Sequence, residues 1–189
     1  MSSSTVRRLL RRHKPEKRHT PLKRRDLADL PFLERSFPLP RALLFDTTVY
    51  VDILQDHFPA IGEIAVRTAD AWHSSVAEAE LIALCRLLNP ADARTRETTR
   101  QISAVIAGMP SHRIVAPDGE IWLEAGVLSG IIARLQGYGR LDRRRVLNDA
   151  LIFSTARKFG MTVLTRNIAG FDLLLQLDPT GRVVFYESD

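Results

Sequence analysis

From residue 41 onward, short apolar runs alternate with longer amphipathic segments, which predicts strands and helices in turn. The predicted strands are 42–45, 72–75, 113–116, 161–165 and 183–186. The predicted helices are 47–54, 61–69, 76–88, 91–107, 118–136, 141–159 and 171–175. Strands that alternate with helices favour an α/β fold with a mostly parallel sheet. We therefore expect residues 42–189 to form one domain, a three-layer sandwich with a central sheet flanked by helices.

Residues 1–41 follow a different pattern, with five prolines and few apolar side chains. This composition predicts a flexible extension, apart from the apolar stretch 27–33, which we expect to dock on another surface. The extension holds 12 Lys/Arg against four acids, a net charge of +8, whereas the rest of the chain holds 15 against 18. The high pI of 9.9 therefore comes from the extension. Such a basic segment attracts RNA or DNA electrostatically.

The single cysteine and the hydropathy of the chain indicate its redox environment and its relation to membranes. Cys85 is the single cysteine and has no disulfide partner in the chain, which favours a reducing, cytoplasmic environment. No apolar run approaches the roughly 18 residues of a membrane span. The basic N-terminus lacks the apolar core of a secretory signal, because Arg11 and Arg12 directly follow Leu9-Leu10. We therefore expect no membrane association.

Three acids and one amide occur where apolar segments leave little packing reason for them. Asp46 ends the strand 42–45, Glu80 lies in the helix 76–88, and Asp149 lies near the middle of the helix 141–159. Asn167 follows the strand 161–165. The carboxyl ends of parallel strands form the usual ligand crevice of an open sheet, so Asp46 and Asn167 are expected to meet there. Two structural alternatives stay open, an N-cap role for Asp46 and a solvent-facing stripe for Asp149.

Oxygen ligands without histidine or cysteine suit a hard cation such as Mg²⁺ or Mn²⁺. Such a cation can activate water for attack on a phosphodiester and stabilise the leaving oxygen. A phosphatase that forms an aspartyl-phosphate would need a second Asp two residues after Asp46, where this chain has Thr48. The cluster Arg143-Arg144-Arg145 is either a phosphate grip beside the metal or a solvated helix face. Trp72 and Trp122 are interpreted as core residues rather than stacking platforms.

Four segments in order resemble the PIN-domain nuclease family, in particular the VapC-like toxins of type II toxin–antitoxin pairs. They are Leu44-Phe45-Asp46-Thr47-Thr48-Val49-Tyr50-Val51-Asp52, Ala79-Glu80-Leu81, Asn148-Asp149-Ala150-Leu151-Ile152-Phe153-Ser154-Thr155-Ala156 and Leu164-Thr165-Arg166-Asn167-Ile168-Ala169-Gly170-Phe171-Asp172. The resemblance covers about 150 residues, from Leu43 to the C-terminus. It implies a PIN-like sandwich.

The same resemblance implies a Mg²⁺- or Mn²⁺-dependent endoribonuclease that is a homodimer with a cognate antitoxin. Asp46, Glu80 and Asp149 would hold the metal, with the Thr48 hydroxyl beside it and Asn167 as the fourth member of the site. Many family members have an acid at the position of Asn167, and Asp172 is a second candidate for that place. Family members also commonly have Ser or Thr where this chain has Ala77, and they begin only a few residues before the first Asp.

The sequence thus predicts hydrolysis of RNA phosphodiester bonds, most simply by the toxin of a toxin–antitoxin pair. A non-catalytic, regulatory PIN protein that binds nucleic acid through its basic extension is the alternative from another class. A DNA-directed nuclease is a nearer alternative. In VapC-like pairs the antitoxin often places a basic side chain near the acids, and Arg35 or Arg41 of the extension would do so within this chain.

Overall fold

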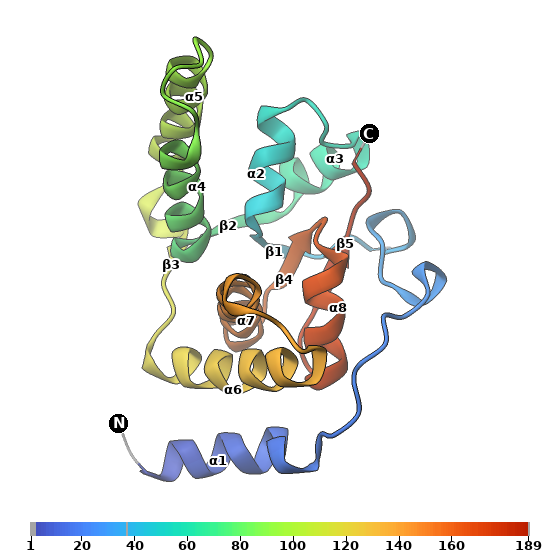
Figure 1. Cartoon of the computed structure of the whole chain (residues 1–189). Helices are drawn as coiled ribbons and strands as arrows, with labels where there is room; N and C mark the ends of the chain where they lie inside the picture. The colour runs from blue at the N-terminus through green and yellow to red at the C-terminus, as the bar shows by residue number, and fades with distance from the viewer. Residues whose placement is uncertain (1–2, 37, 189) are drawn as a thin grey trace.

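The computed structural model describes residues 3–36 and 38–188, and its centre is a five-stranded, wholly parallel sheet (Figure 1). The strand order is β3-β2-β1-β4-β5. The strands are β1 (Ala42–Phe45), β2 (Asp70–Ser74), β3 (Ile114–Val115), β4 (Thr162–Thr165) and β5 (Val183–Phe185). The predicted α/β class and parallel sheet are therefore confirmed. β1 and β4 lie at the centre, where both faces are covered and near-continuous apolar residues are required.

Helices cover both faces of the sheet. The helices of the described residues are α1 (Ser3–His13), α2 (Thr47–Leu54), α3 (Ala60–Thr68), α4 (Ser75–Leu87), α5 (Thr95–Ala107), α6 (Gly119–Gln136), α7 (Arg140–Phe159) and α8 (Ile168–Leu177), of which α1 lies on α6 rather than on the sheet. Short 3₁₀ turns are Pro15–Lys17, Leu27–Asp29, Leu33–Arg35 and Ser111–Arg113. Side chains of a strand alternate between the faces. Leu44 accordingly packs in the core formed with α6, α7 and α8, whereas Leu43 and Phe45 pack with α2, α3, α4 and α5.

Local capping chemistry explains where several helices begin and end. Ser74 and Asp118 cap α4 and α6 by accepting from backbone N–H groups of the first turn. Gly160 ends α7 with a φ of 71°, a left-handed conformation that favours glycine. α5 begins at Thr95 rather than at residue 91, because the Asn89 and Asp92 side chains accept from backbone N–H groups and form turns there. α8 begins earlier than predicted, at Ile168.

The predicted extension lies against the rest of the chain along most of its length. α1 packs on the outer side of α6, with Leu9 and His13 buried (Figure 1). Farther along, Phe32 and Leu33 are buried, and Pro31 accepts a hydrogen bond of 2.8 Å from the backbone N–H of Phe185. The apolar stretch 27–33 thus docks beside β5, as expected. The helix α1 was not predicted, and the division of the chain at residue 41 stays a prediction.

Side chains of this segment pair with buried carboxylates of residues 42–188. Arg12 pairs with Asp178, and the His13 ring nitrogen lies 3.0 Å from Glu124. Arg25 Nε donates to Asp172 at 2.6 Å. Because buried charges require partners, residues 3–25 contribute to the fold as well as to net charge. In the part of the chain that is described, no helix is long and apolar enough to cross a membrane.

Candidate metal site and adjoining pocket

The parallel pairing of β1 with β4 brings Asp46 and Asn167 to one edge of the sheet. Asp46 directly follows β1, and its backbone N–H donates to the carbonyl oxygen of Leu164 in β4 at 3.1 Å. Asn167 follows β4 by one residue and caps α8, accepting from the Gly170 N–H at 3.0 Å. The predicted meeting of the two strand ends is therefore present in the structure.

The Asp46 carboxylate is buried and held by hydroxyl groups. Its Oδ2 atom accepts from Thr48 Oγ1 and from Thr165 Oγ1, both at 2.7 Å. Asp46 occupies the N-cap position of α2 but makes no side-chain capping bond. The alternative of a purely capping role therefore does not account for this side chain. Burial raises the pKa of Asp46 most strongly, and the nearby Glu80 charge raises it further.

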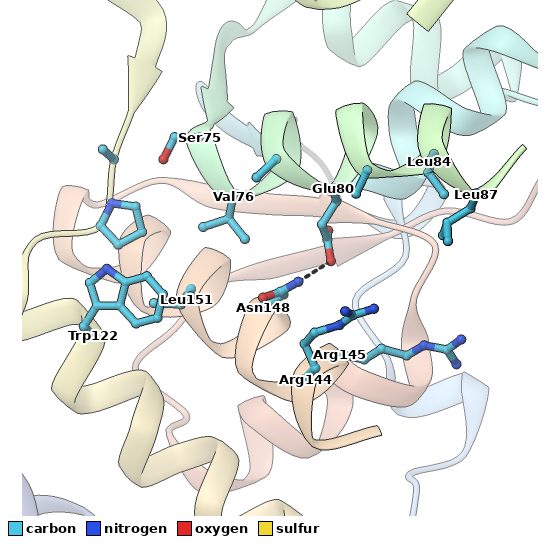
Figure 2. A pocket seen from close by; sticks show the side chains of 14 residues that line it. Ser75, Val76, Glu80, Leu84, Leu87, Trp122, Arg144, Arg145, Asn148 and Leu151 are labelled. Carbon is cyan, nitrogen blue, oxygen red and sulfur yellow. Dashed lines mark hydrogen bonds between the residues drawn. The ribbon is translucent and has the colours of Figure 1, made fainter. Parts of the chain in front are cut away.

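Glu80 reaches the same place from α4, where its charge acts on Asp46. Asn148 Nδ2 donates to Glu80 Oε1 at 2.6 Å, as Figure 2 shows. Thr47 Oγ1 donates to the second carboxylate oxygen. These two donors fix the Glu80 carboxylate between α2 and α7.

Asp149 completes the acid group from α7 and does not belong to a solvent-facing stripe. Asn167 Nδ2 donates to Asp149 Oδ2 at 3.0 Å. The pKa of Asp149 is raised well above its usual value, first by burial and then by the Asp46 and Glu80 charges. The three carboxylates are thus near enough to repel one another, and a positive ion between them would relieve that repulsion.

The surrounding backbone leaves little free room beside Asp149. A Cβ atom built on Gly170 would lie 2.2 Å from Asp149 Oδ2 and 2.9 Å from Asn167 Nδ2. Only glycine allows the first turn of α8 to approach the carboxylate this closely. The sequence pattern gave no reason to select Gly170.

Sequence reasoning also missed three polar side chains that hold the acids, namely Thr47, Asn148 and Thr165. Thr165 ends β4, so its place at the strand edge could have been inferred from the strand boundary alone. Asn148 directly precedes Asp149, but on a helix neighbouring residues point about 100° apart, so its contact with Glu80 depends on the position of α4.

Asp172, the second candidate for the fourth position, lies away from the acid group. It is fully buried, and its carboxylate accepts from Arg25 and from Gln176. Arg35 donates to the carbonyl oxygens of Leu27 and Ala28, and Arg41 lies 3.8 Å from Asp70. These contacts give none of the three a role at the acid group, and the expectation that Arg35 or Arg41 would approach the acids finds no support in them.

Among the described residues, a different set of groups, and not the three acids, meets the close spacing of a metal site. Within residues 3–36 and 38–188, His13, Glu124 and Asp178 are the three potential ligands whose atoms all lie within 4.8 Å of one another. Arg157 pairs with both of these carboxylates, and Arg12 pairs with Asp178 at 2.8 Å. Two arginines therefore already neutralise the two acids, and the pKa values of both are lowered, against the effect of burial, by these cations and hydrogen bonds. The spacing fits a metal, but the charge balance does not require one.

An open pocket of about 600 Å³ adjoins the acid group between α4 and the helix pair α6–α7 (Figure 2). Glu80 and Asn148 line it, as do Arg144 and Arg145. Arg143, the third member of the predicted basic cluster, instead donates to the Tyr138 carbonyl oxygen at 3.0 Å. The structure thus places two of the three arginines at the pocket beside the acids.

The two tryptophans differ from each other in burial. Trp72 is partly buried against the core, as predicted, and stacks under Arg113 at 5.1 Å. Trp122 is 51% exposed and lines the pocket, so its assignment to the core was wrong. The run Ile121-Trp122-Leu123 is continuously apolar and does not indicate which of its members faces outward.

Neither a protein-family model nor a curated protein matches the sequence. The solved structures that are similar to the chain include VapBC2 from Rickettsia felis bound to a DNA fragment from its promoter, DNA-bound VapBC from Salmonella typhimurium, and FitAcB from Neisseria gonorrhoeae. Their identities are 17%, 18% and 20%, and their TM-scores are 0.53, 0.52 and 0.51. The matches cover 77%, 76% and 76% of this chain and 98%, 97% and 96% of those chains. At this identity the likeness establishes the fold alone: the chain has the α/β fold of PIN-domain VapC structures.

Proposed function

We propose that the protein is a divalent-metal-dependent endoribonuclease that hydrolyses RNA phosphodiester bonds. The observation that carries the proposal is the gathering of Asp46, Glu80 and Asp149 from three different elements, with burial and mutual repulsion raising the pKa values of Asp46 and Asp149. Perturbed acids of this kind are typical of functional sites. Arg144 and Arg145 beside the acids fit a polyanionic substrate.

The donor set fits Mg²⁺ or Mn²⁺, because it consists of carboxylate oxygens supported by hydroxyl and amide groups. Asp46, Glu80 and Asp149 would hold the cation, which would supply Lewis-acid polarisation of the phosphodiester and of a water. Thr48 and Thr165 fix the Asp46 carboxylate, and Asn148 and Asn167 fix the other two. Such fixation of the ligands keeps their geometry ready for the cation.

The proposed role in the cell is supported by the similar solved structures. The similar structures of VapBC2, VapBC and FitAcB are toxin–antitoxin complexes. We therefore propose that this chain is the toxin of such a pair, acts in the cytoplasm as a homodimer, and has a cognate antitoxin. The lone thiol of Cys85 agrees with a reducing compartment.

Cleavage of a mixed, structured RNA pool by the full chain tests this proposal. We expect fragments with Mn²⁺ or Mg²⁺, none after chelation, and a loss of at least about 100-fold with Asp149→Asn, in line with the several kcal/mol that a metal contributes to such reactions. A pool of DNA of the same sequences, run in parallel, assigns the nucleic acid. Metal-independent cleavage, or equal rates for the wild type and Asp149→Asn, would refute the assignment of the acids.

A non-catalytic nucleic-acid-binding protein is the competing function, supported by the net charge of +8 on residues 1–41. Several of these cations, however, are engaged by carboxylates of the domain, including Arg8, Arg12 and Arg25. Salt-sensitive RNA binding by both the wild type and Asp149→Asn, without cleavage by either, would favour this competitor.

A further inference from the structure

The pocket beside the acid group has two chemically different ends. The end near the start of α6 is apolar and includes Trp122 and Leu151, whereas the other end carries Arg144 and Arg145 together with Leu84 and Leu87 (Figure 2). Glu80 and Asn148 lie between these ends, joined by their hydrogen bond. The volume of about 600 Å³ is in the range of small-molecule and nucleotide sites. A ligand that fills it must present an apolar, flat part and an anionic part.

Trp122 is the unusual feature of the apolar end. The residue lies in the first turn of α6, and half of its surface is exposed although Ile121 beside it is 1% exposed. A large aromatic side chain gains stability from burial, and an exposed one that lines a pocket offers a flat face to a ligand. Phe159, at the far end of α7, is also 51% exposed but does not line this pocket. It therefore serves as a matched control.

The basic end is available to an anion. Arg144 and Arg145 are exposed, and neither forms an ion pair of 4.0 Å or less with any residue in the described parts of the chain. Both arginines line the same pocket as Glu80 of the acid group (Figure 2). A phosphate at these arginines would therefore stand next to the carboxylates.

We propose that this pocket, named the Trp122 pocket, binds one unpaired nucleobase of the RNA substrate. The base stacks on Trp122, and its phosphate lies at Arg144 and Arg145. The inference rests on the proposed function and adds to it a base-binding subsite, whose stacked base must be free of a partner strand. In an A-form duplex the base faces are covered by their neighbours, whereas unpaired bases stack readily on aromatic side chains.

Binding of a 12-nucleotide oligouridine RNA carrying a fluorescent label, measured by anisotropy, tests the proposal. The full chain with Asp149→Asn serves as the background, so that no cleavage occurs during the titration. We expect Trp122→Leu to raise Kd about tenfold, because stacking of one base is worth roughly 1–3 kcal/mol and about 1.4 kcal/mol corresponds to tenfold. Trp122→Phe retains a ring and should lose less, and Phe159→Leu should bind as the background does.

Two further measurements distinguish base stacking on Trp122 from a structural role of this residue. The same RNA annealed to its oligoadenosine complement should bind equally to the Trp122→Leu and background proteins, because its bases cannot reach the ring. In active protein, Trp122→Leu should raise KM for an unpaired substrate with kcat retained. A merely structural role would instead lower kcat, or reduce the melting temperature, together with binding.

Equal Kd values for Trp122→Leu and the background would overturn the inference, even if the wild type cleaves RNA in a metal-dependent manner. Failure of the wild type to cleave RNA would instead reject the proposed function. The Kd values of Trp122→Leu and the background would still test whether a base stacks on Trp122. If Trp122→Leu leaves RNA binding unchanged but shifts the protein from dimer to monomer in sedimentation, the pocket belongs to contact with a second copy, and the inference is likewise wrong.

Discussion

Replacement of Arg25 by methionine tests whether the N-terminal segment is part of the folded structure. Arg25 Nε donates at 2.6 Å to Asp172, which is fully buried, while the Arg25 side chain is 37% exposed. Methionine keeps the length and the apolar stem of the side chain but removes the charge. The variant therefore leaves one buried carboxylate without its ion-pair partner.

The expected loss follows from the contacts of Asp172. A hydrogen bond to a charged group contributes about 1.5–3 kcal/mol. Complete loss of the partner of a buried charge costs about 3–5 kcal/mol, but Asp172 retains the Arg25 backbone N–H at 3.0 Å and Gln176 at 2.9 Å. The partial exposure of Arg25 reduces the value further through solvent screening. We predict a loss of about 1.5–2 kcal/mol in the free energy of unfolding, or about 3–8 °C in Tm.

Urea unfolding followed by circular dichroism measures this loss. Arg24→Met is the matched control, because Arg24 is exposed and forms no ion pair with any described residue, and it should change stability by less than about 0.5 kcal/mol. In the Asp172→Asn background, Arg25→Met should cost clearly less than in the wild type, which a double-mutant cycle reports as coupling. Equal losses for the Arg24 and Arg25 variants would refute the packing of this segment through Asp172.

Three further predictions concern the acid group. The pKa of Asp149 is raised in the folded state, so the native protein loses stability as the pH rises from the pKa of the unfolded state, about 4, through the pKa of the folded state. Metal-free Asp149→Asn should therefore have a higher Tm than wild type at pH 7.5, and the difference should close toward pH 4. A lower Tm of the variant at pH 7.5 would contradict this. Asn148→Ala removes the hydrogen-bond donor to Glu80 and should lower the rate of metal-dependent cleavage about 10- to 100-fold, with partial recovery at high Mn²⁺. An unchanged cleavage rate across a metal titration would show that Asn148 does not position Glu80. Gly170→Ala places a Cβ 2.2 Å from Asp149 Oδ2 and should abolish cleavage. Gly126→Ala, whose Cβ meets nothing within 4 Å, should retain cleavage. Similar activities of the two variants would show that the close approach of Gly170 to Asp149 is not required.

The sheet and the approximate position of the acid group could be predicted because their signals are local. Short apolar runs marked β1 and β4, and Asp46 and Asn167 stand directly at their ends. Once these strands are parallel and adjacent, both side chains must lie at one edge of the sheet. The helical positions of Glu80 and Asp149 within apolar segments completed the set.

The rest depends on contacts between distant parts of the chain. α1 is rich in arginine and short, and the burial of Leu9 and His13 against α6 contributes stability that no local pattern indicates. Asp172 looked equivalent to a metal ligand because its partner, Arg25, is 147 residues away in sequence. The exposure of Trp122 likewise could not be predicted from the sequence, because its neighbours are also apolar and do not indicate which side of α6 faces solvent.

The position of the metal is the central claim, and Mn²⁺ binding measured by electron paramagnetic resonance tests it most directly. Wild type, Asp149→Asn and Glu124→Gln would be titrated as full chains after circular dichroism has verified their folding. Glu124 is the comparison because it belongs, with His13 and Asp178, to the group whose close spacing fits a metal. We predict that wild type and Glu124→Gln bind Mn²⁺ alike and that Asp149→Asn loses this binding. Retention by Asp149→Asn with loss in Glu124→Gln would place the metal at the other group and contradict the account.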